Sequence, residues 1–345
     1  MVLRVLVVLS VLTLCGVRFE PDLAAQGAIP YKLGAFEAAG GRFVGLVVGD
    51  AVARLDQALD RPPREMAELM ARYDELKPRL GEIAAAAAGQ GARPKYVLRR
   101  TSVRVLPPVL PGTMLNAAVN YVEHEKEMAG AGALGAPPPK PPDAIPGIWP
   151  RQPGDTRQNP YLFPKLRSAV IADGEAIRIP AGRDRIDWEC ELTIVVGRVA
   201  SRVPVERAAD YIFGYTLEND VSDRGGRGDG RHGSDWLLGK SHDTFAPLGP
   251  FVVPREFVPD PQKLAITFTL NGTVMQDSNT SRMTHTVFEL LSYASHILTL
   301  HPGDAIATGS PAGVGTARAT PIYFKAGDRS VCTIERIGTL SNPVQ

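Results

Sequence analysis

Two glutamates separated by a single residue, Glu189 and Glu191, lie in a β-branched and aromatic stretch that predicts a strand. Residues two apart on a strand share a face, so both carboxylates point one way, while Trp188, Cys190 and Leu192 point into a core. Two negative charges this close repel unless a cation or proton separates them. A divalent ion would do so, because carboxylate oxygens suit Mg²⁺, Mn²⁺ or Ca²⁺. The alternative is an exposed sheet face with solvated acids.

Charged side chains further along the chain could complete such a site. Asp220 follows another apolar stretch and could supply a third oxygen donor. Arg224 carries a planar guanidinium that suits a substrate carboxylate. Lys240 is predicted to be a lone cation in a cleft that stabilises an enolate or carboxylate. Its surroundings resemble a phosphate-binding loop, but Ser234 occupies the place of the first glycine of that motif, so this interpretation fails.

A histidine and a glutamate at helical spacing could handle protons. His124 and Glu127 lie in a segment of helix-forming composition, where residues three apart can touch. A carboxylate that holds an imidazole fixes its tautomer and raises its basicity, as in a base that activates water. The alternative is an ordinary surface pair. The position of this pair just before a proline-rich segment favours the catalytic interpretation.

The composition is that of a soluble globular protein. The chain has 345 residues, 44% hydrophobic and 22% charged, and its 38 basic and 37 acidic side chains give a formal charge of +1. No long basic run is present, so no nucleic-acid partner is expected. The three cysteines, Cys15, Cys190 and Cys332, are too few for a disulfide framework, and a bridge is not implied.

The first residues resemble a secretory leader. A single cation, Arg4, precedes a short apolar run, and Ala24 and Ala25 are small enough for a cleavage site. We therefore expect residues 1–25 to be a signal peptide and the protein to be exported, with a cytoplasmic location as the alternative. No other segment approaches the length of a membrane span, so no stable membrane association is expected after removal of the leader.

The remaining chain divides into two parts. Residues 26–104 predict a small α/β domain with two strands that meet at a Gly40-Gly41 turn, then a helix that Pro78 ends and a second helix from about Arg79. Residues 105–345 predict a β-rich body, in which the proline-rich residues 131–160 form an extended lid or linker.

These residues, taken in order, resemble the fumarylacetoacetate hydrolase superfamily, most clearly between residues 105 and 314. The motifs that carry the resemblance are Asn120-Tyr121-x-x-His124-x-x-Glu127, Leu162-Phe163-x-Lys165, Asp187-x-Glu189-x-Glu191-Leu192, Gly214-Tyr215 through Asp220-x-x-x-Arg224, Trp236-x-x-x-Lys240-Ser241-x-Asp243-Thr244-Phe245, Asn271-Gly272, Gln276-Asp277-Ser278-Asn279-Thr280 and Thr308-Gly309-Ser310-Pro311-Ala312-Gly313-Val314-Gly315. Each motif is weak alone, and their order makes the resemblance specific.

The resemblance implies an α+β fold, in which a mixed β-sandwich roll or barrel follows the small N-terminal α/β domain, and usually a homodimer. It implies Mg²⁺ or Mn²⁺, with Ca²⁺ as a further option, bound by Glu189, Glu191 and Asp220. The implied catalytic residues are His124, Glu127 and Lys240, and the implied substrate-binding residues are Tyr121, Lys165, Arg224 and Ser310. Two departures from the family pattern are the proline-rich insertion and Arg227, which stands where some C–C hydrolases of the family carry glutamine.

Three functional hypotheses follow. The first is a metal-dependent hydrolase or lyase that cleaves a C–C bond in a small anionic β-diketo or 2-keto acid, such as an acylpyruvate. The second is an isomerase or decarboxylase of a hydroxy-diene dioate. The third is a non-catalytic keto-acid-binding protein, which His124 and Glu127 argue against because binding alone needs no base. A cupin-like oxygenase is disfavoured because the acids lack two nearby histidines for iron.

Overall fold

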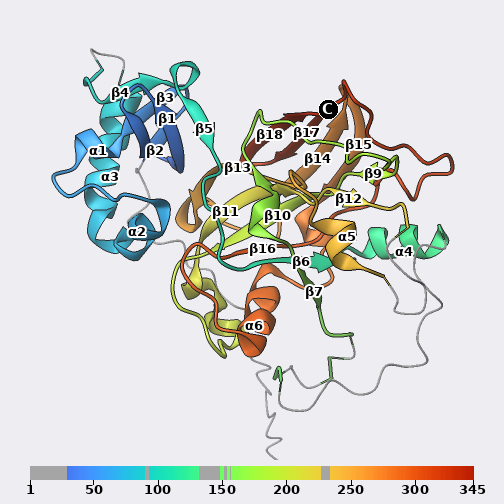
Figure 1. Ribbon diagram of the computed structural model, residues 1–345. Coiled ribbons are helices and arrows are strands. Elements are labelled where there is room, and N and C mark those ends of the chain that lie inside the picture. The colour runs from blue at the N-terminus through green and yellow to red at the C-terminus, as the bar shows by residue number, and fades with distance from the viewer. Residues whose placement is uncertain (1–28, 90–92, 132–147, 151–153, 156, 227–233) are drawn as a thin grey trace, which may run out of the picture.

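The computed structural model describes residues 29–345 apart from residues 90–92, 132–147, 151–153, 156 and 227–233 (Figure 1). The predicted leader, most of the proline-rich lid and Arg227 lie outside the described residues. Within the described part of the chain, no helix is long and apolar enough to cross a membrane.

The N-terminal unit is an antiparallel meander with helices packed against it, seen as the blue and cyan part of Figure 1. Its apolar strand residues and the helical spacing of its apolar side chains were both visible in the sequence. Its strands are β1 (Lys32–Ala38), β2 (Gly41–Val48), β3 (Ala51–Arg54) and β4 (Val97–Arg99), and its helices are α1 (Leu55–Ala58), α2 (Met66–Ala71) and α3 (Tyr73–Ala88).

The expectation that Pro78 ends a helix is wrong. Helix α3 runs through Pro78, and the interruption instead falls at Arg72, between α2 and α3. Proline removes one helical hydrogen bond, the one that the carbonyl of Asp74 would accept. Both Pro78 and Asp74 are exposed, so water can satisfy that carbonyl, while Leu76 and Leu80 bury the opposite face.

One twelve-stranded sheet extends from the N-terminal unit through the body of the protein. Its main path runs β4-β3-β2-β1-β13-β11-β10-β16-β6-β7, and the two units meet where β1 pairs with β13 at Leu33 and Val252. The strands of the body are β6 (Met114–Ala118), β7 (Tyr161–Pro164), β10 (Cys190–Val196), β11 (Ile212–Asn219), β13 (Ala246–Pro254) and β16 (Ala305–Ala307), with β5 (Arg104–Leu106) and β8 (Val170–Ile171) off the main path.

A second, four-stranded sheet covers the central strands. Its order is β15-β14-β17-β18, built from β14 (Ala265–Leu270), β15 (Thr273–Asn279), β17 (Arg329–Ile334) and β18 (Gly338–Pro343). Asn271 and Gly272 form the predicted hairpin turn, both with positive φ. Between the sheets Trp188 stacks on Phe268 with ring centroids 5.4 Å apart, which confirms its predicted place in the core.

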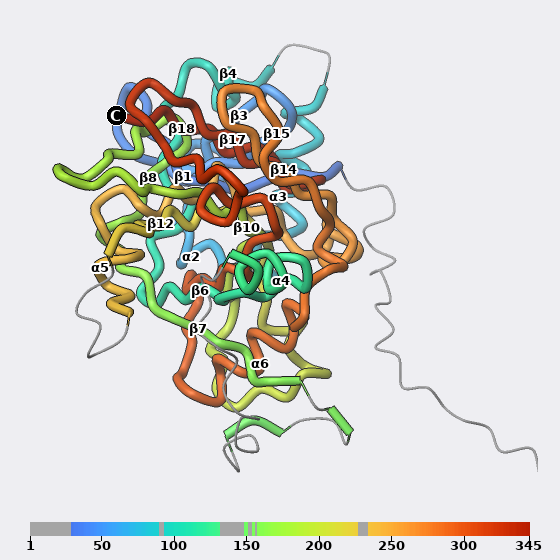
Figure 2. Tube along the Cα trace, turned by 90° about the vertical axis from the view of Figure 1, so that its right-hand side faces the viewer, coloured from blue at the N-terminus to red at the C-terminus, as the bar shows by residue number. Residues whose placement is uncertain are grey.

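Short elements complete the body and position the site. They are the two-stranded pair β9 (Ile186–Asp187) and β12 (Ser222–Asp223), the helices α4 (Val122–Gly130), α5 (Trp236–Lys240) and α6 (Val287–Ile297), and the 3-10 turns η2 (Arg100–Ser102), η3 (Arg167–Ala169), η4 (Val205–Tyr211), η5 (Arg255–Phe257) and η6 (Thr280–Arg282). Figure 2 shows α4 in front of the edge of the sheet near β10. The α+β expectation is confirmed.

The structure contains a disulfide that the sequence did not imply. Cys190 and Cys332 are bridged, with their Cα atoms 5.5 Å apart, although 142 positions separate them in the chain. Both residues are buried, as predicted for Cys190. The pairing requires β10 to pack against β17 of the other sheet, and no local pattern in the sequence shows that contact.

The bridge should contribute measurably to stability. Cys332→Ala is expected to lower the free energy of unfolding by about 2–4 kcal/mol without reductant, because the cross-link closes a long loop in the unfolded chain. Urea unfolding of both proteins, with and without reductant, measures the effect. Equal midpoints without reductant would show that the bridge contributes nothing.

Candidate active site

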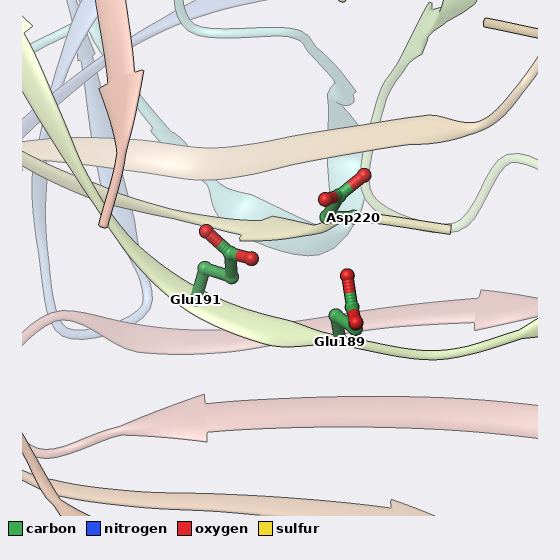
Figure 3. Close-up of side chains that lie close together, drawn as sticks. All are labelled: Glu189, Glu191 and Asp220. Carbon is green, nitrogen blue, oxygen red and sulfur yellow. The ribbon is translucent and has the colours of Figure 1, made fainter. Parts of the chain in front are cut away.

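Three buried carboxylates converge at the end of the central strands. Oxygen atoms of Glu189, Glu191 and Asp220 all lie within 4.8 Å of one another, and Figure 3 shows the three side chains facing a common point. Glu191 belongs to β10, Glu189 immediately precedes it, and Asp220 follows β11, the neighbouring antiparallel strand. The backbone N–H of Asp220 donates to the Glu189 carbonyl at 2.8 Å, which fixes the two segments together. Side-chain exposure of 8% or less excludes the solvated-face alternative.

Glu191 has no cationic partner among the described residues. It accepts a hydrogen bond from the backbone N–H of Gly309 at 2.7 Å, and Glu218 lies directly opposite it on β11. Burial, together with the nearby charges of Asp220, Glu218 and Glu189, raises the pKa of the Glu191 carboxyl well above its usual value. No positively charged side chain in the described part of the chain therefore forms an ion pair with this carboxylate.

Three cations surround the other two acids. Lys240 Nζ donates to Glu189 at 2.6 Å and to Asp220 at 2.5 Å, and Arg224 Nη2 donates to Glu189 at 2.5 Å. Lys165 pairs with Asp220 and also donates to the carbonyl of Val221 at 3.1 Å. Burial opposes the charge on Glu189, but Arg224, Lys240 and His124 outweigh it and hold the pKa of this carboxyl well below its usual value.

The predicted histidine–glutamate pair forms on α4. His124 Nδ1 and Glu127 Oε2 are 3.0 Å apart, and the other oxygen of Glu127 accepts from the backbone N–H of Gly313 at 2.9 Å. The second ring nitrogen, Nε2, lies 3.7 Å from Glu189 Oε1. His124 is only 2% exposed, so the surface-pair alternative is wrong. The imidazole is thus held at one nitrogen while the other faces the acids.

A cavity of about 100 Å³ opens beside these groups. Charged residues and an apolar wall line it together. The charged residues are His124, Glu189, Glu191, Arg224 and Lys240, and the apolar wall includes Ala117, Ala118, Met128, Phe163 and Trp236. Lys240 Nζ lies 4.9 Å from the centroid of the Phe163 ring, so charged and apolar groups are adjacent. The cavity therefore suits a ligand that carries both a carboxylate or carbonyl and a carbon skeleton.

Ser310 and Tyr121 occupy different places. Ser310 lines the cavity, and its Oγ accepts from Gln276 Nε2 at 2.7 Å. Tyr121 is fully buried, is not among the residues that line the cavity, and its hydroxyl has no hydrogen-bond partner in the described part of the chain. Burial and the charge of Glu191 raise the pKa of this phenol. The substrate-binding role of Tyr121 stays a prediction.

Two buried acids next to the site were given no role from the sequence. Asp187 accepts from Arg224 Nε at 3.1 Å and from the backbone N–H of Gly315 at 2.7 Å, so it joins the arginine to the loop after Ser310. Glu218 accepts from Asn116 Nδ2 at 3.0 Å and lies 3.8 Å from Lys165. Burial and the charge of Asp220 raise the pKa of Glu218 to about 8, although Lys165 opposes this. Its spacing two before Asp220 was the available signal, since the same spacing marked Glu189 and Glu191.

The residues present fit a divalent cation. The buried cluster contains five carboxylates and three cations, so two negative charges are in excess when all five carboxylates are ionised. The carboxylates are Asp187, Glu189, Glu191, Glu218 and Asp220, and the cations are Lys165, Arg224 and Lys240. Oxygen donors are those that Mg²⁺ and Mn²⁺ prefer, and an ion of charge +2 would balance the excess.

The metal-free protein should lose stability as pH rises from about 5 to 8. Glu191 and Glu218 have pKa values raised in the folded state, so above their unfolded value of 4.5 the folded protein binds more protons than the unfolded chain. The stabilising contribution of these two residues is complete below pH 4.5 and is lost as the pH rises through their pKa values in the folded state. The pKa of Glu189 is lowered in the folded state, so this residue changes the stability only below pH 4.5.

Urea unfolding in chelator across this range measures that slope. Added Mn²⁺ should flatten it, and Glu218→Gln should reduce it. Stability that rises with pH in the chelated protein would contradict the assignment of these raised pKa values.

Comparison with known proteins places the chain in a family. Residues 113–345 match the profile described as fumarylacetoacetate (FAA) hydrolase C-terminal. The chain therefore belongs to the fumarylacetoacetate hydrolase family, as the sequence motifs indicated.

Individual relatives carry different activities in their names. The mitochondrial oxaloacetate tautomerase of Xenopus laevis is 36% identical over 251 residues, which cover 72% of this chain and 71% of that protein. The 2-hydroxyhepta-2,4-diene-1,7-dioate isomerase structure from Mycobacterium marinum is 28% identical with a TM-score of 0.65, covering 91% of this chain and 98% of its own. The maleylpyruvate hydrolase of Sphingobium sp. SYK-6, solved with manganese(II) and pyruvate, is 26% identical with a TM-score of 0.66 and the same coverage.

These similarities support an enzyme of this superfamily, rather than a binding protein without turnover. They also support the fold and, through the acidic triad, a divalent-metal site. These relatives are named for different reactions, as a hydrolase, an isomerase and a tautomerase, so the names do not agree on one reaction.

Proposed function

We propose that this protein is a divalent-cation-dependent enzyme that forms and protonates the enolate of a small 2-keto acid. Its reaction would be the keto–enol tautomerisation of a keto diacid such as oxaloacetate. C–C cleavage was the first expectation from the sequence. Tautomerisation comes ahead of it here because relatives about one-third identical over most of the chain carry that name.

The observation that carries the proposal is the His124–Glu127 pair beside the buried acids. Glu127 holds Nδ1 of the ring at 3.0 Å, which leaves Nε2 to exchange a proton with the substrate. In the proposed reaction Nε2 takes a proton from C3 of the keto acid and then gives a proton to the oxygen at C2, which yields the enol. The ring then returns to its starting protonation state, so protons balance.

The other residues bind and orient the substrate. A cation bound by Glu189, Glu191 and Asp220 would polarise the C2 carbonyl and offset the charge of the enolate. Lys240 lines the cavity, where its ammonium can stabilise the same enolate oxygen. Arg224 offers a planar fork for the substrate carboxylate and is oriented by Asp187. The burial of all these groups excludes water and strengthens their electrostatic effect.

The apolar wall favours a second candidate, hydrolysis of an acylpyruvate. Phe163 and Trp236 lie with ring centroids 4.6 Å apart and their planes inclined at 34°, and they give the cavity an aromatic lining. Such a wall suits a hydrocarbon acyl tail. In that reaction His124 would activate water to attack the acyl carbonyl, the C3–C4 bond would break, and the released pyruvate enolate would take a proton at C3.

One pair of assays separates the candidates. Purified protein with Mn²⁺ is tested on the oxaloacetate enol by ultraviolet absorbance, and on acetylpyruvate by release of pyruvate and acetate. We expect enol interconversion that chelation removes and that His124→Gln lowers. Acetylpyruvate cleavage without enol interconversion would replace the first candidate by the second, and a chelation-resistant rate on either substrate would contradict both.

A further inference from the structure

A second and larger cavity lies away from the acids. It has a volume of about 530 Å³, and none of its lining residues lines the cavity beside His124. The N-terminal strands, β13 and the beginning of β18 enclose it, close to the place where β1 pairs with β13. Its size falls within the range of sites for small organic ligands, and junctions between structural units are common places for them.

Three cations face this cavity, and no acidic residue among those that the structure describes lines it. They are Lys32, Arg100 and Arg336. Lys32 is half-buried, its Nζ donates to the carbonyl of Ile337 at 2.8 Å, and it has no ion pair in the described part of the chain. Burial and the charge of Arg100 lower the pKa of Lys32. The two positive charges are therefore close enough to repel each other.

Nearby acids do not neutralise this charge. Among the described acidic side chains, Arg336 approaches Glu335 alone, at 3.9 Å, and both of these side chains are about half exposed, so the pair is weak. Asp173 lies within electrostatic reach of Arg100, but it does not line the cavity and accepts a hydrogen bond from the backbone of Ser341 at 2.8 Å. The cavity is therefore an electropositive region without a built-in counter-ion.

The floor of the cavity is apolar, and Phe257 is its partly exposed ring. Tyr31, Phe251 and Val253 are each 5% exposed or less and support it from below the surface. Tyr31 packs edge-on against Phe257 with ring centroids 4.9 Å apart, and its hydroxyl is fixed by Tyr73 at 2.8 Å. A ligand with a flat hydrocarbon body would bury area mainly against Phe257.

We propose that this cleft is a binding site for a small soluble organic anion, with its carboxylate, sulfonate or phosphate held by Lys32, Arg100 and Arg336 and its apolar body on the aromatic floor. Charge complementarity and the mixed lining support this class of ligand over a neutral or purely inorganic one. The site does not depend on the function proposed for the acid cavity.

Fluorescence titration with anilinonaphthalene sulfonate, an aromatic anion, tests the site in the full-length protein. The double variant R100Q/R336Q should weaken binding roughly tenfold or more, because it removes two charge-assisted contacts. R99Q is the matched control: Arg99 is exposed and adjacent but does not line the cavity, so binding should stay within about twofold of wild type. The neutral dye phenylnaphthylamine should bind more weakly and respond to neither change.

Further measurements separate this site from the acid cavity and from a protein interface. E191Q, which disables the proposed catalytic site, should bind the sulfonate as wild type does. Sulfonate binding that is absent, that R100Q/R336Q leaves unchanged, or that E191Q removes would overturn the proposal. Sedimentation should give the same mass for wild type and R100Q/R336Q. A lower mass for the double variant would show that a second copy of the chain fills the cleft instead.

Discussion

Replacing Glu191 with glutamine is expected to remove divalent-cation binding and at the same time to stabilise the metal-free protein. Glu191 is buried, lacks a cationic partner in the described part of the chain, and stands opposite Glu218. Glutamine can keep the hydrogen bond from the Gly309 amide, at 2.7 Å in the present structure, while removing one unbalanced negative charge. The variant should therefore unfold at a higher temperature in chelator.

Cation affinity should change in the opposite direction. Loss of a direct carboxylate donor should weaken Mn²⁺ binding by about a hundredfold or more. Even the mutation of residues that only orient metal ligands typically lowers metal affinity about 10- to 100-fold. Calorimetric titration and thermal unfolding in chelator measure the two effects.

Glu218→Gln is the matched control for this experiment. It removes a buried charge from the same network but lies outside the triad of convergent oxygens, so it should stabilise the metal-free protein and retain cation binding. Unchanged Mn²⁺ affinity in E191Q would contradict the metal assignment. A lower unfolding temperature for E191Q in chelator would contradict the charge argument.

Replacing His124 with glutamine is expected to lower kcat by about 10²- to 10⁴-fold, the usual contribution of a general acid–base group. Glutamine retains polar atoms near Glu127 but cannot take up a proton from the substrate. His124 does not belong to the triad, so Mn²⁺ affinity should stay within about threefold. Kinetics with saturating Mn²⁺, and calorimetry on the same preparation, give both quantities.

Glu127→Gln tests whether the carboxylate acts through the histidine. A glutamine can still accept or donate one hydrogen bond at His124 Nδ1, 3.0 Å away, but it no longer stabilises the imidazolium. We expect a smaller fall in kcat than for H124Q and a shift in the pH dependence of kcat. Full activity in H124Q would contradict the role of His124 as the base. An unshifted pH profile in E127Q would show that Glu127 makes only a structural contact with His124.

Much of the site could be predicted because its residues carry local signals. Alternation on a strand placed Glu189 and Glu191 together, and helical spacing joined His124 to Glu127. The strand itself is interrupted: β9 ends at Asp187 and β10 begins at Cys190, because the backbone N–H of Glu189 bonds to the side chain of Asn219 rather than to a strand partner. The side chains still alternate through the gap, so the prediction for the carboxylates was unaffected.

Features that depend on contacts between distant segments could not be predicted. The Cys190–Cys332 bridge needs the two sheets to pack face to face. The raised pKa of Glu218 comes first from its burial, which depends on how the strands pack, and then from the charge of Asp220. Helix α5, which carries Lys240, is only five residues long and starts with Asp235 accepting from the Leu238 amide, so no apolar period marks it.

The central claim is that one divalent ion is held by Glu189, Glu191 and Asp220. Anomalous diffraction at the manganese edge, on crystals grown with Mn²⁺ and compared with chelated crystals, tests it directly. The structure predicts one strong peak per chain within bonding distance of all three carboxylates, and none after chelation. Well-occupied manganese elsewhere, with this cluster empty, would contradict the claim.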